Sequence, residues 1–168
     1  MMKGEDESIH QSDEVSPLHL IETGDKTALV CIGDQALSEK IGQVVRELGY
    51  HVVVAQKPSS ALSRLKYNHY DLIVLDESYG ETDGSKNPVL LHLQSLPMPV
   101  RRKSFLCLLS QQSVSLDHME AFRFGANLTL NFRDVEKMQV VLERVIKDND
   151  VFYAVFNDEL SKRGASSV

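Results

Sequence analysis

Short apolar runs alternate with amphipathic segments along most of this chain, and that alternation limits its fold more than any other feature. Five runs have the length and apolar content of strands: TALVCI, HVVVA, DLIVL, SFLCLLS and LTLNF. The continuous run TALVCI predicts a strand buried on both faces. After each run, apolar residues recur at three- and four-residue spacing, as on one face of a helix. Such alternation predicts an α/β fold, in which a doubly wound parallel sheet of five strands has helices on both faces.

Capping and terminating residues set the expected bounds of the helices. These residues are Gly49, Pro58, Asn87, Gly125 and Asp134. The fourth helix is expected from Leu116 to Phe124, and Asp134 is expected to cap the fifth.

Composition divides the chain into three parts. Residues 1–25 are acidic, polar and aperiodic, which predicts a flexible lead-in or the end of an interdomain linker. Residues 26–148 hold the five strand–helix units. Within 149–168, helical spacing resumes, which predicts an extra helix from Val151 to Lys162 whose apolar stripe needs a partner. That partner is either the body of the domain or another chain.

Charge and composition exclude several classes of function. A formal net charge of −6 argues against nucleic-acid binding, and the basic cluster of Arg101, Arg102 and Lys103 is expected to be a solvated turn. No apolar run approaches the roughly 20 residues that span a bilayer, so no membrane association is expected. The N-terminus has no hydrophobic signal core, and Cys31 and Cys107 lie in apolar runs as buried, reduced thiols would. A cytoplasmic location is expected.

Asp76 directly follows the apolar residues of the third predicted strand. In doubly wound sheets, sites lie beyond the carboxyl ends of the strands, where the winding direction changes. Asp76 is therefore the candidate site residue. The alternative is a polar strand end that only caps the neighbouring loop.

Several motifs, in order, resemble the receiver domain of bacterial two-component response regulators, from Thr27 to about Asp148. The run RELGYHVVVAQKPSSALSRLKYNHYDLIVLD has the family's spacing up to the phospho-accepting aspartate, which falls on Asp76. Asp83 and Gly84 match the loop after it, and GANLTLNFRDVEKM looks like the fifth strand and fifth helix.

The resemblance implies a flavodoxin-like receiver fold with strand order 2-1-3-4-5. In that order the first and fourth strands flank the third. Cys31 and Cys107 would then lie about 10 Å apart, which is too far for a disulfide.

The residues that receivers use for phosphoryl transfer are poorly matched. Receivers bind a divalent cation with the phospho-accepting aspartate and an acidic pair after the first strand. They also use a Ser or Thr hydroxyl at the end of the fourth strand and a lysine at the end of the fifth. In place of the acidic pair the chain has Ile32 and Gly33, or Gly33 and Asp34 if the register is shifted by one residue. Ser110 supplies the hydroxyl at the end of the fourth strand, and Asn131 replaces the lysine at the end of the fifth. Asparagine carries no charge to offset a phosphate.

These substitutions leave a weak candidate Mg²⁺ site of Asp34, Asp76 and Glu77, and no tightly bound cofactor is expected. The chain is interpreted as a degenerate receiver that is not an enzyme and that contacts other proteins independently of phosphorylation. The alternative is a working receiver phosphorylated on Asp76 in a phosphorelay. A flavodoxin-like small-molecule binder is a third hypothesis.

Aromatic residues indicate where a partner would bind. Phe122 and Phe124 lie about 200° apart around a helix, so both cannot face one core, and Phe124 is expected to be the exposed one. In the resembled family, the face of the fourth helix, fifth strand and fifth helix meets partners. The predicted interaction residues, for a protein partner or a second copy, are Phe122, Phe124, Leu128, Phe152 and Phe156.

Overall fold

The computed structural model describes residues 24–81 and 86–165. The expected lead-in at 1–25 lies almost wholly outside the described residues, as do Asp83 and Gly84.

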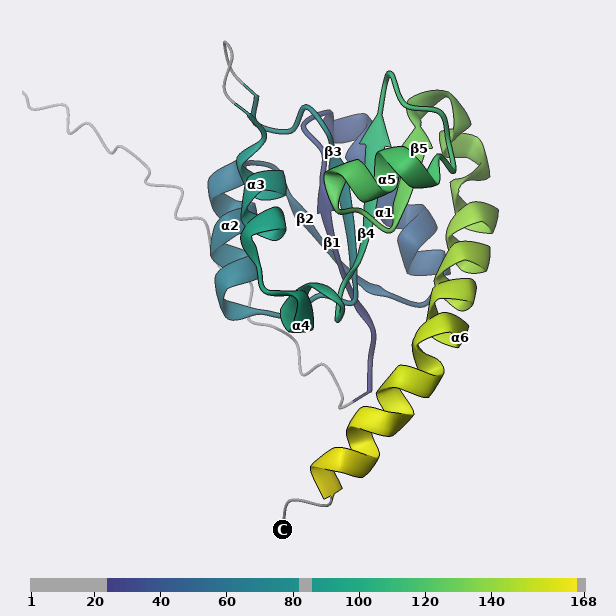
Figure 1. Ribbon diagram of the computed structural model, residues 1–168. Coiled ribbons are helices and arrows are strands. Elements are labelled where there is room, and N and C mark those ends of the chain that lie inside the picture. The colour runs from purple at the N-terminus through teal and green to yellow at the C-terminus, as the bar shows by residue number, and fades with distance from the viewer. Residues whose placement is uncertain (1–23, 82–85, 166–168) are drawn as a thin grey trace, which may run out of the picture.

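Five parallel strands form one sheet in the order β2-β1-β3-β4-β5, which confirms the predicted fold class and strand order (Figure 1). The strands are β1 Thr27–Cys31, β2 His51–Ala55, β3 Leu72–Asp76, β4 Phe105–Ser110 and β5 Leu128–Asn131. The helices are α1 Gln35–Glu47, α2 Pro58–Tyr67, α3 Pro88–Ser95, α4 Met98–Arg101, α5 His118–Phe124 and α6 Met138–Ala165, with a 3-10 helix, η1, at Phe132–Lys137.

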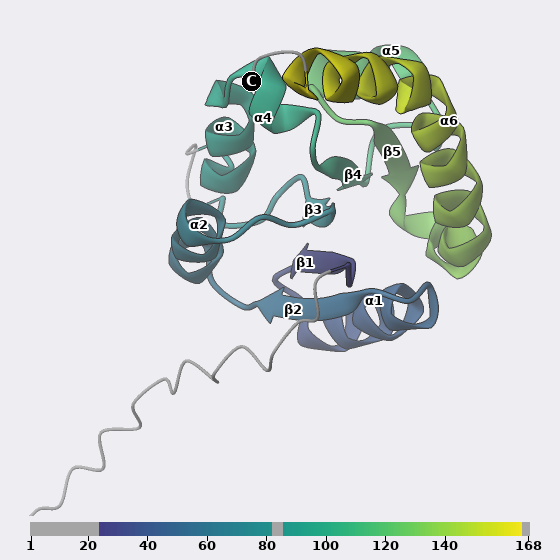
Figure 2. The ribbon, with the colours of Figure 1, turned by 90° about the horizontal axis from the view of Figure 1, so that it is seen from below.

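Helices cover both faces of the sheet (Figure 2). One hydrophobic cluster lies between the sheet and helices α1 and α6, and a second lies between the sheet and helices α2 and α3, with α5 on the same side. Successive residues of a strand point to opposite faces, so Ala28 and Val30 join the first cluster while Leu29 joins the second. The apolar runs of β1, β3 and β4 are therefore continuous because both of their faces are buried, whereas the edge strand β2 is only partly buried.

The two cysteines have buried, free thiols, as expected. Cys31 pairs with Leu75 and Cys107 pairs with Val74, so the two thiols point to opposite faces of the sheet. Burial raises the pKa of each thiol to about 12. A disulfide between them is excluded by this geometry.

The end of the chain differs from the prediction. The separate helix expected from Val151 to Lys162 is the C-terminal half of a continuous α6, which extends past the edge of the sheet in yellow (Figure 1). No glycine or proline occurs between Met138 and Arg163, so nothing in the sequence interrupts the helix. None of the described helices combines the length and apolar character that a membrane span requires.

Two local expectations are also corrected. Asn131, not Asp134, caps the turn before α6, because its side chain accepts from Arg133 N, whereas the carboxylate of Asp134 accepts from Ser115 Oγ at 2.5 Å. Helix α5 begins at His118 rather than Leu116, because Asp117 Oδ1 caps it.

The basic cluster consists of the last residue of a short helix, Arg101, and of Arg102 and Lys103 in an exposed turn, as expected for these two. Arg101 belongs to α4 and donates from Nη2 to the carbonyl of Gly125 at 3.0 Å. Arg102 holds its guanidinium 4.7 Å from the ring centre of Phe156. Both arginines therefore connect α4 to other elements.

Candidate functional site

Three of the predicted site residues end adjacent strands. Asp76 pairs with Leu109 in the β3–β4 ladder, and Ser110 pairs with Asn131 in the β4–β5 ladder. The sheet therefore brings Asp76, Ser110 and Asn131 to one carboxyl edge. This arrangement follows from parallel strands whose polar residues come directly after the buried run.

The carboxylate of Asp76 holds the turn that follows it. Its Oδ1 accepts hydrogen bonds from Ser78 N at 2.9 Å and from Ser78 Oγ at 2.8 Å. The side chain is half-buried. This is the loop-capping geometry that was weighed as the alternative for this residue.

Glu77 connects the β3–α3 loop to the β4–α5 loop. Its backbone N–H donates to Leu109 O at 2.9 Å, and its Oε1 accepts from Gln111 N at 2.8 Å. The carboxylate that could have supplied a metal ligand therefore stabilises the loop after β4.

The hydroxyl of Ser110 accepts hydrogen bonds from the loop that follows β4. The side chain is fully buried, and Oγ accepts from Gln112 N at 3.1 Å and from Ser113 N at 2.9 Å. Satisfaction of this hydroxyl by the backbone was expected for a serine at a strand end.

Asn131 holds the opposite side of the same loop. Its Nδ2 donates to Gln111 O at 3.2 Å and to Ser113 O at 2.9 Å, while its Oδ1 accepts from Arg133 N at 3.0 Å. The amide thus satisfies loop carbonyls at the position where a receiver would present an ammonium group.

Asn87 is a site residue whose full role the sequence did not reveal. It was identified only as a helix cap, which its Oδ1 provides for α3 by accepting from Val89 N and Leu90 N at 3.1 Å. Its Nδ2 also donates to the carbonyls of Asp76 at 2.9 Å and Glu77 at 3.1 Å. This buried amide therefore joins the tip of β3 to α3. A polar residue just before Pro88 was the available signal.

Tyr79 and Gly80 close the β3–α3 loop against the start of α2. The hydroxyl of Tyr79 donates to Ala55 O at 2.8 Å, and burial of the ring raises the pKa of Tyr79 well above its ordinary value. Gly80 has φ +73°, and a Cβ added there would lie 2.3 Å from Pro58 Cγ. The loop after Asp76 is thus tied to both β2 and α2.

The residues present do not fit a receiver-type Mg²⁺ site. Ile32 is fully buried in the first hydrophobic cluster and Gly33 has no side chain, so neither supplies a carboxylate. Asp34 caps α1 by accepting from Leu37 N at 2.7 Å. Within the described ranges, no group of three or more His, Cys, Asp or Glu side chains is placed to hold a metal ion.

No lysine or arginine forms an ion pair with Asp76 within residues 24–81 and 86–165. Two cationic residues, Lys86 and Arg123, line the same hollow as Glu77 and Ser78. The pKa of Arg123 is raised by its hydrogen bond to Glu120 and, to a smaller extent, by the charge of Glu77. A phosphate on Asp76 would therefore lack the lysine that receivers present from the end of the fifth strand.

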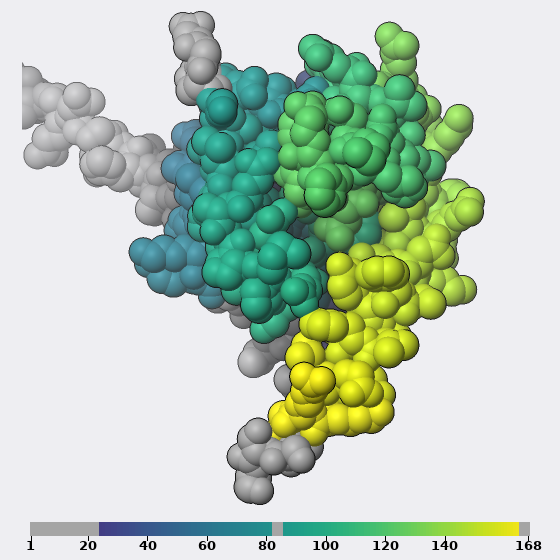
Figure 3. All heavy atoms as spheres, viewed as in Figure 1, coloured from purple at the N-terminus to yellow at the C-terminus, as the bar shows by residue number. Residues whose placement is uncertain are grey.

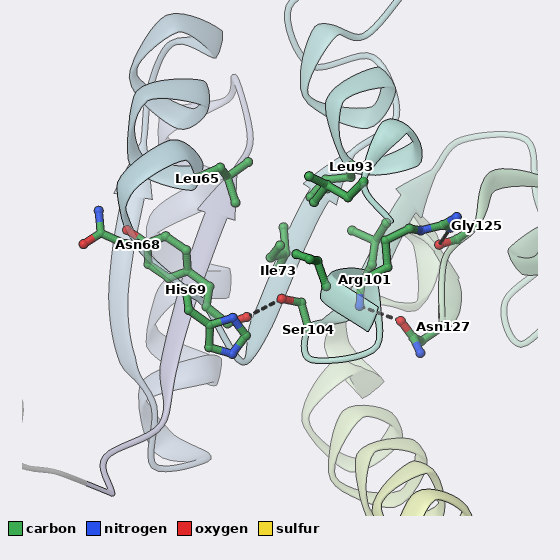
Figure 4. A pocket seen from close by; sticks show the side chains of 13 residues that line it. Leu65, Asn68, His69, Ile73, Leu93, Arg101, Ser104, Gly125 and Asn127 are labelled. Carbon is green, nitrogen blue, oxygen red and sulfur yellow. Dashed lines mark hydrogen bonds between the residues drawn. The ribbon is translucent and has the colours of Figure 1, made fainter. Parts of the chain in front are cut away.

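A cavity of about 80 Å³ lies at the opposite edge of the sheet, below α2 and α3 (Figure 4). Leu65, Ile73 and Leu93 line it, and Ser104 Oγ closes one side by donating to Tyr70 O at 2.7 Å. Pockets for nucleotides or flavins are typically about 300 Å³ or larger. This cavity is therefore too small for a nucleotide or a flavin.

The aromatic residues of α5 are placed opposite to the prediction. Phe122 is 82% exposed, whereas Phe124 packs against the second hydrophobic cluster. Ala121 is buried and fixes the orientation of the helix, and Phe124 lies three residues after it on the same face. Leu128 is also wrong as an interaction residue, because it is buried in the first cluster.

The predicted residues of the C-terminal extension are accessible. Phe152 is 76% exposed and Phe156 is 39% exposed on α6. Phe122 on α5 is exposed as well, so three of the predicted interaction residues are accessible. We call these three residues the aromatic surface.

The strand order and the aspartate at the tip of the central strand define a receiver-like α/β domain, and solved structures of this class are similar to the chain. The receiver domain of a Francisella response regulator (1452) has a TM-score of 0.57 and 19% identity, over 73% of this chain and 98% of that one. A putative response regulator from Chloroflexus aurantiacus has a TM-score of 0.56 and 22% identity, over 72% of this chain and 98% of that one. The chemotaxis response regulator CheY4 of Vibrio cholerae has a TM-score of 0.56 and 17% identity, over 71% of this chain and 98% of that one.

These likenesses show that the chain has the fold of response regulator receiver domains. No family model matches the chain. A curated protein, the terminal-differentiation specific adenylate cyclase of Dictyostelium discoideum, is 34% identical over 70 residues. The match covers 40% of this chain and 3% of the cyclase, so the chain corresponds to a small part of that protein.

Replacing Asn131 with alanine should loosen the β4–α5 loop. The variant would lose the two hydrogen bonds that Nδ2 donates to loop carbonyls, which lowers the stability of the loop by roughly 1–2 kcal/mol. The amide hydrogens of Gln112 and Ser113 should therefore exchange about tenfold faster. Hydrogen exchange followed by NMR measures this directly. Asn68→Ala, at the opposite edge of the sheet, should leave both amides unchanged. Unaltered exchange in Asn131→Ala would show that the amide does not hold the loop.

Proposed function

We propose that the chain is a receiver-fold docking module in signal transduction, and that its contacts with other proteins do not depend on phosphorylation of Asp76. The observation that carries the proposal is the commitment of Asp76, Glu77, Ser110 and Asn131 to hydrogen bonds within their own loops. A receiver switch requires these positions to bind a cation and a phosphate and then to rearrange.

The docking face would be the aromatic surface on α5 and α6. Its phenylalanines are exposed on elements that correspond to the partner-binding face of the resembled family. Exposed aromatic side chains are frequent anchors at protein interfaces. The partner would therefore be a protein, either a different one or a second copy.

A test of the proposal is incubation with acetyl phosphate and Mg²⁺, followed by intact-mass measurement. Phosphoryl transfer loses about 10²–10³ in rate for each missing electrostatic contact, so only a minor fraction should gain a phosphoryl group. Asp76→Asn provides the matched control and should lack even this minor adduct. A stoichiometric phosphoryl adduct that disappears in Asp76→Asn would overturn the proposal.

The second candidate function is a working receiver phosphorylated on Asp76. It is favoured by one observation, namely that the carboxylate is only half-buried at the tip of β3, where a donor could reach it. In that case Lys86 or Arg123, rather than a residue of β5, would have to supply the positive charge.

A further inference from the structure

A furrow runs along the side of the molecule where the C-terminal half of α6 passes α4 and α5 (Figure 3). Two hollows of about 510 Å³ and about 650 Å³ form it, and they adjoin because Arg102 and Tyr153 line both. The first hollow includes Lys26, close to the first described residue, and the second reaches Phe122 on α5. We call these two hollows the α6 furrow.

The α6 furrow is more basic than the rest of the chain. Its charged lining consists of Lys26, Arg101, Arg102, Lys103 and Arg123 against Asp71 and Asp150, whereas the whole chain has a formal net charge of −6. The carboxylate of Asp71 is already engaged, since its Oδ2 accepts from Thr27 N at 2.8 Å. A positive region on a negatively charged chain attracts an acidic ligand.

The α6 furrow also presents apolar side chains. Phe156 and Leu160 line it and remain 39% and 53% exposed, with the guanidinium of Arg102 lying 4.7 Å from the ring centre of Phe156. A segment that carries both acidic and apolar residues would bury these side chains and pair with the basic rim.

We propose that residues 1–23 of the same chain occupy the α6 furrow. This segment has six acidic residues and one lysine, and its apolar residues include Leu18, Leu20 and Ile21. It joins the described chain at Gly24, two residues before Lys26, which lines the furrow. An extended segment of this length reaches up to about 75 Å, so it can follow both hollows.

Attachment to the domain makes even a weak contact effective. A tethered segment experiences a local concentration in the millimolar range, so it competes with free ligands without high affinity.

A spin label tests the contact in the full-length chain. Because Cys31 and Cys107 are fully buried, Ser12→Cys introduces the one accessible thiol to which a nitroxide can be attached. In the ¹⁵N-labelled protein, the amide signals of Arg102 and Tyr153 should lose most of their intensity, and reduction of the nitroxide should restore them. Exposed residues of α2, such as Ser63, should change much less. Uniform or absent broadening would overturn the proposal.

Charge reversal provides the matched comparison. Arg102→Glu with Lys103→Glu should restore the signals of Tyr153, and so should 1 M salt, at which the Debye length is about 3 Å. Lys57→Glu with Lys66→Glu makes the same change of charge on α2 and should leave the broadening unchanged. Broadening that persists after reversal in the furrow contradicts the assigned site.

A mixed sample separates contact within one chain from contact between chains. Unlabelled protein carrying the nitroxide is mixed with ¹⁵N-labelled protein that lacks it. Broadening in this mixture would assign the furrow to a segment of a second copy and would overturn the proposal. Phosphorylation of Asp76 has no part in these measurements, so failure of the proposed function would leave this result intact.

Discussion

Replacing Gly80 with alanine is expected to lower the free energy of unfolding by about 2–5 kcal/mol. The left-handed backbone at φ +73° costs an alanine roughly 1–2 kcal/mol, and overpacking adds about 1–3 kcal/mol. The overpacking arises because the new Cβ would lie 2.3 Å from Pro58 Cγ, and a proline ring cannot rotate away. Urea denaturation monitored by circular dichroism measures the change.

Gly49 provides the matched control for this substitution. It also has a positive φ, +89°, but an added Cβ there meets no atom within 4 Å. Gly49→Ala should therefore cost only the backbone part, about 1–2 kcal/mol. Equal losses for the two variants would mean that the β3–α3 loop is not closely packed on α2.

Replacing Asn87 with alanine should destabilise the domain by about 3 kcal/mol. The side chain is buried and makes hydrogen bonds to two carbonyls and two N–H groups, and its removal leaves these groups without partners at roughly 1–3 kcal/mol each, with partial relaxation. Urea denaturation again provides the measurement.

Asn87→Asp separates the two roles of this side chain. The aspartate keeps an oxygen for capping α3 but loses the donors to the carbonyls of Asp76 and Glu77, so we expect a loss similar to that of Asn87→Ala at neutral pH. The exposed Asn157→Ala should change stability by less than about 0.5 kcal/mol. A stable Asn87→Asp variant would contradict the bridging role.

The sequence predicted the strands and the position of Asp76, because both depend on the local apolar pattern. The strand order followed from the resemblance to receiver domains. The sequence also predicted that Ser110 would be satisfied by backbone. The bridge from Glu77 to Gln111 could not be predicted, since it joins loops 34 residues apart through side-chain geometry.

The errors have a common physical origin in tertiary packing. The orientation of α5 depends on which small residue contacts the sheet, and Ala121 turns Phe124 inward and Phe122 outward. Leu128 was predicted to be an interaction residue, yet the pleat of β5 places it in the core. The continuity of α6 was missed because a polar stretch on an exposed helix resembles a linker.

The side chains at the carboxyl edge of the sheet already form hydrogen bonds within their own loops. We therefore expect no divalent metal ion to bind there. Mn²⁺ accepts the same oxygen ligands as Mg²⁺ and broadens nearby NMR signals. At Mn²⁺ concentrations equal to that of the protein, the amide signals of Asp76, Glu77 and Gln111 should keep the same intensity as those of distant residues. Selective, saturable loss of these three signals would show that the carboxylates leave their loops to bind a cation, and it would contradict the account.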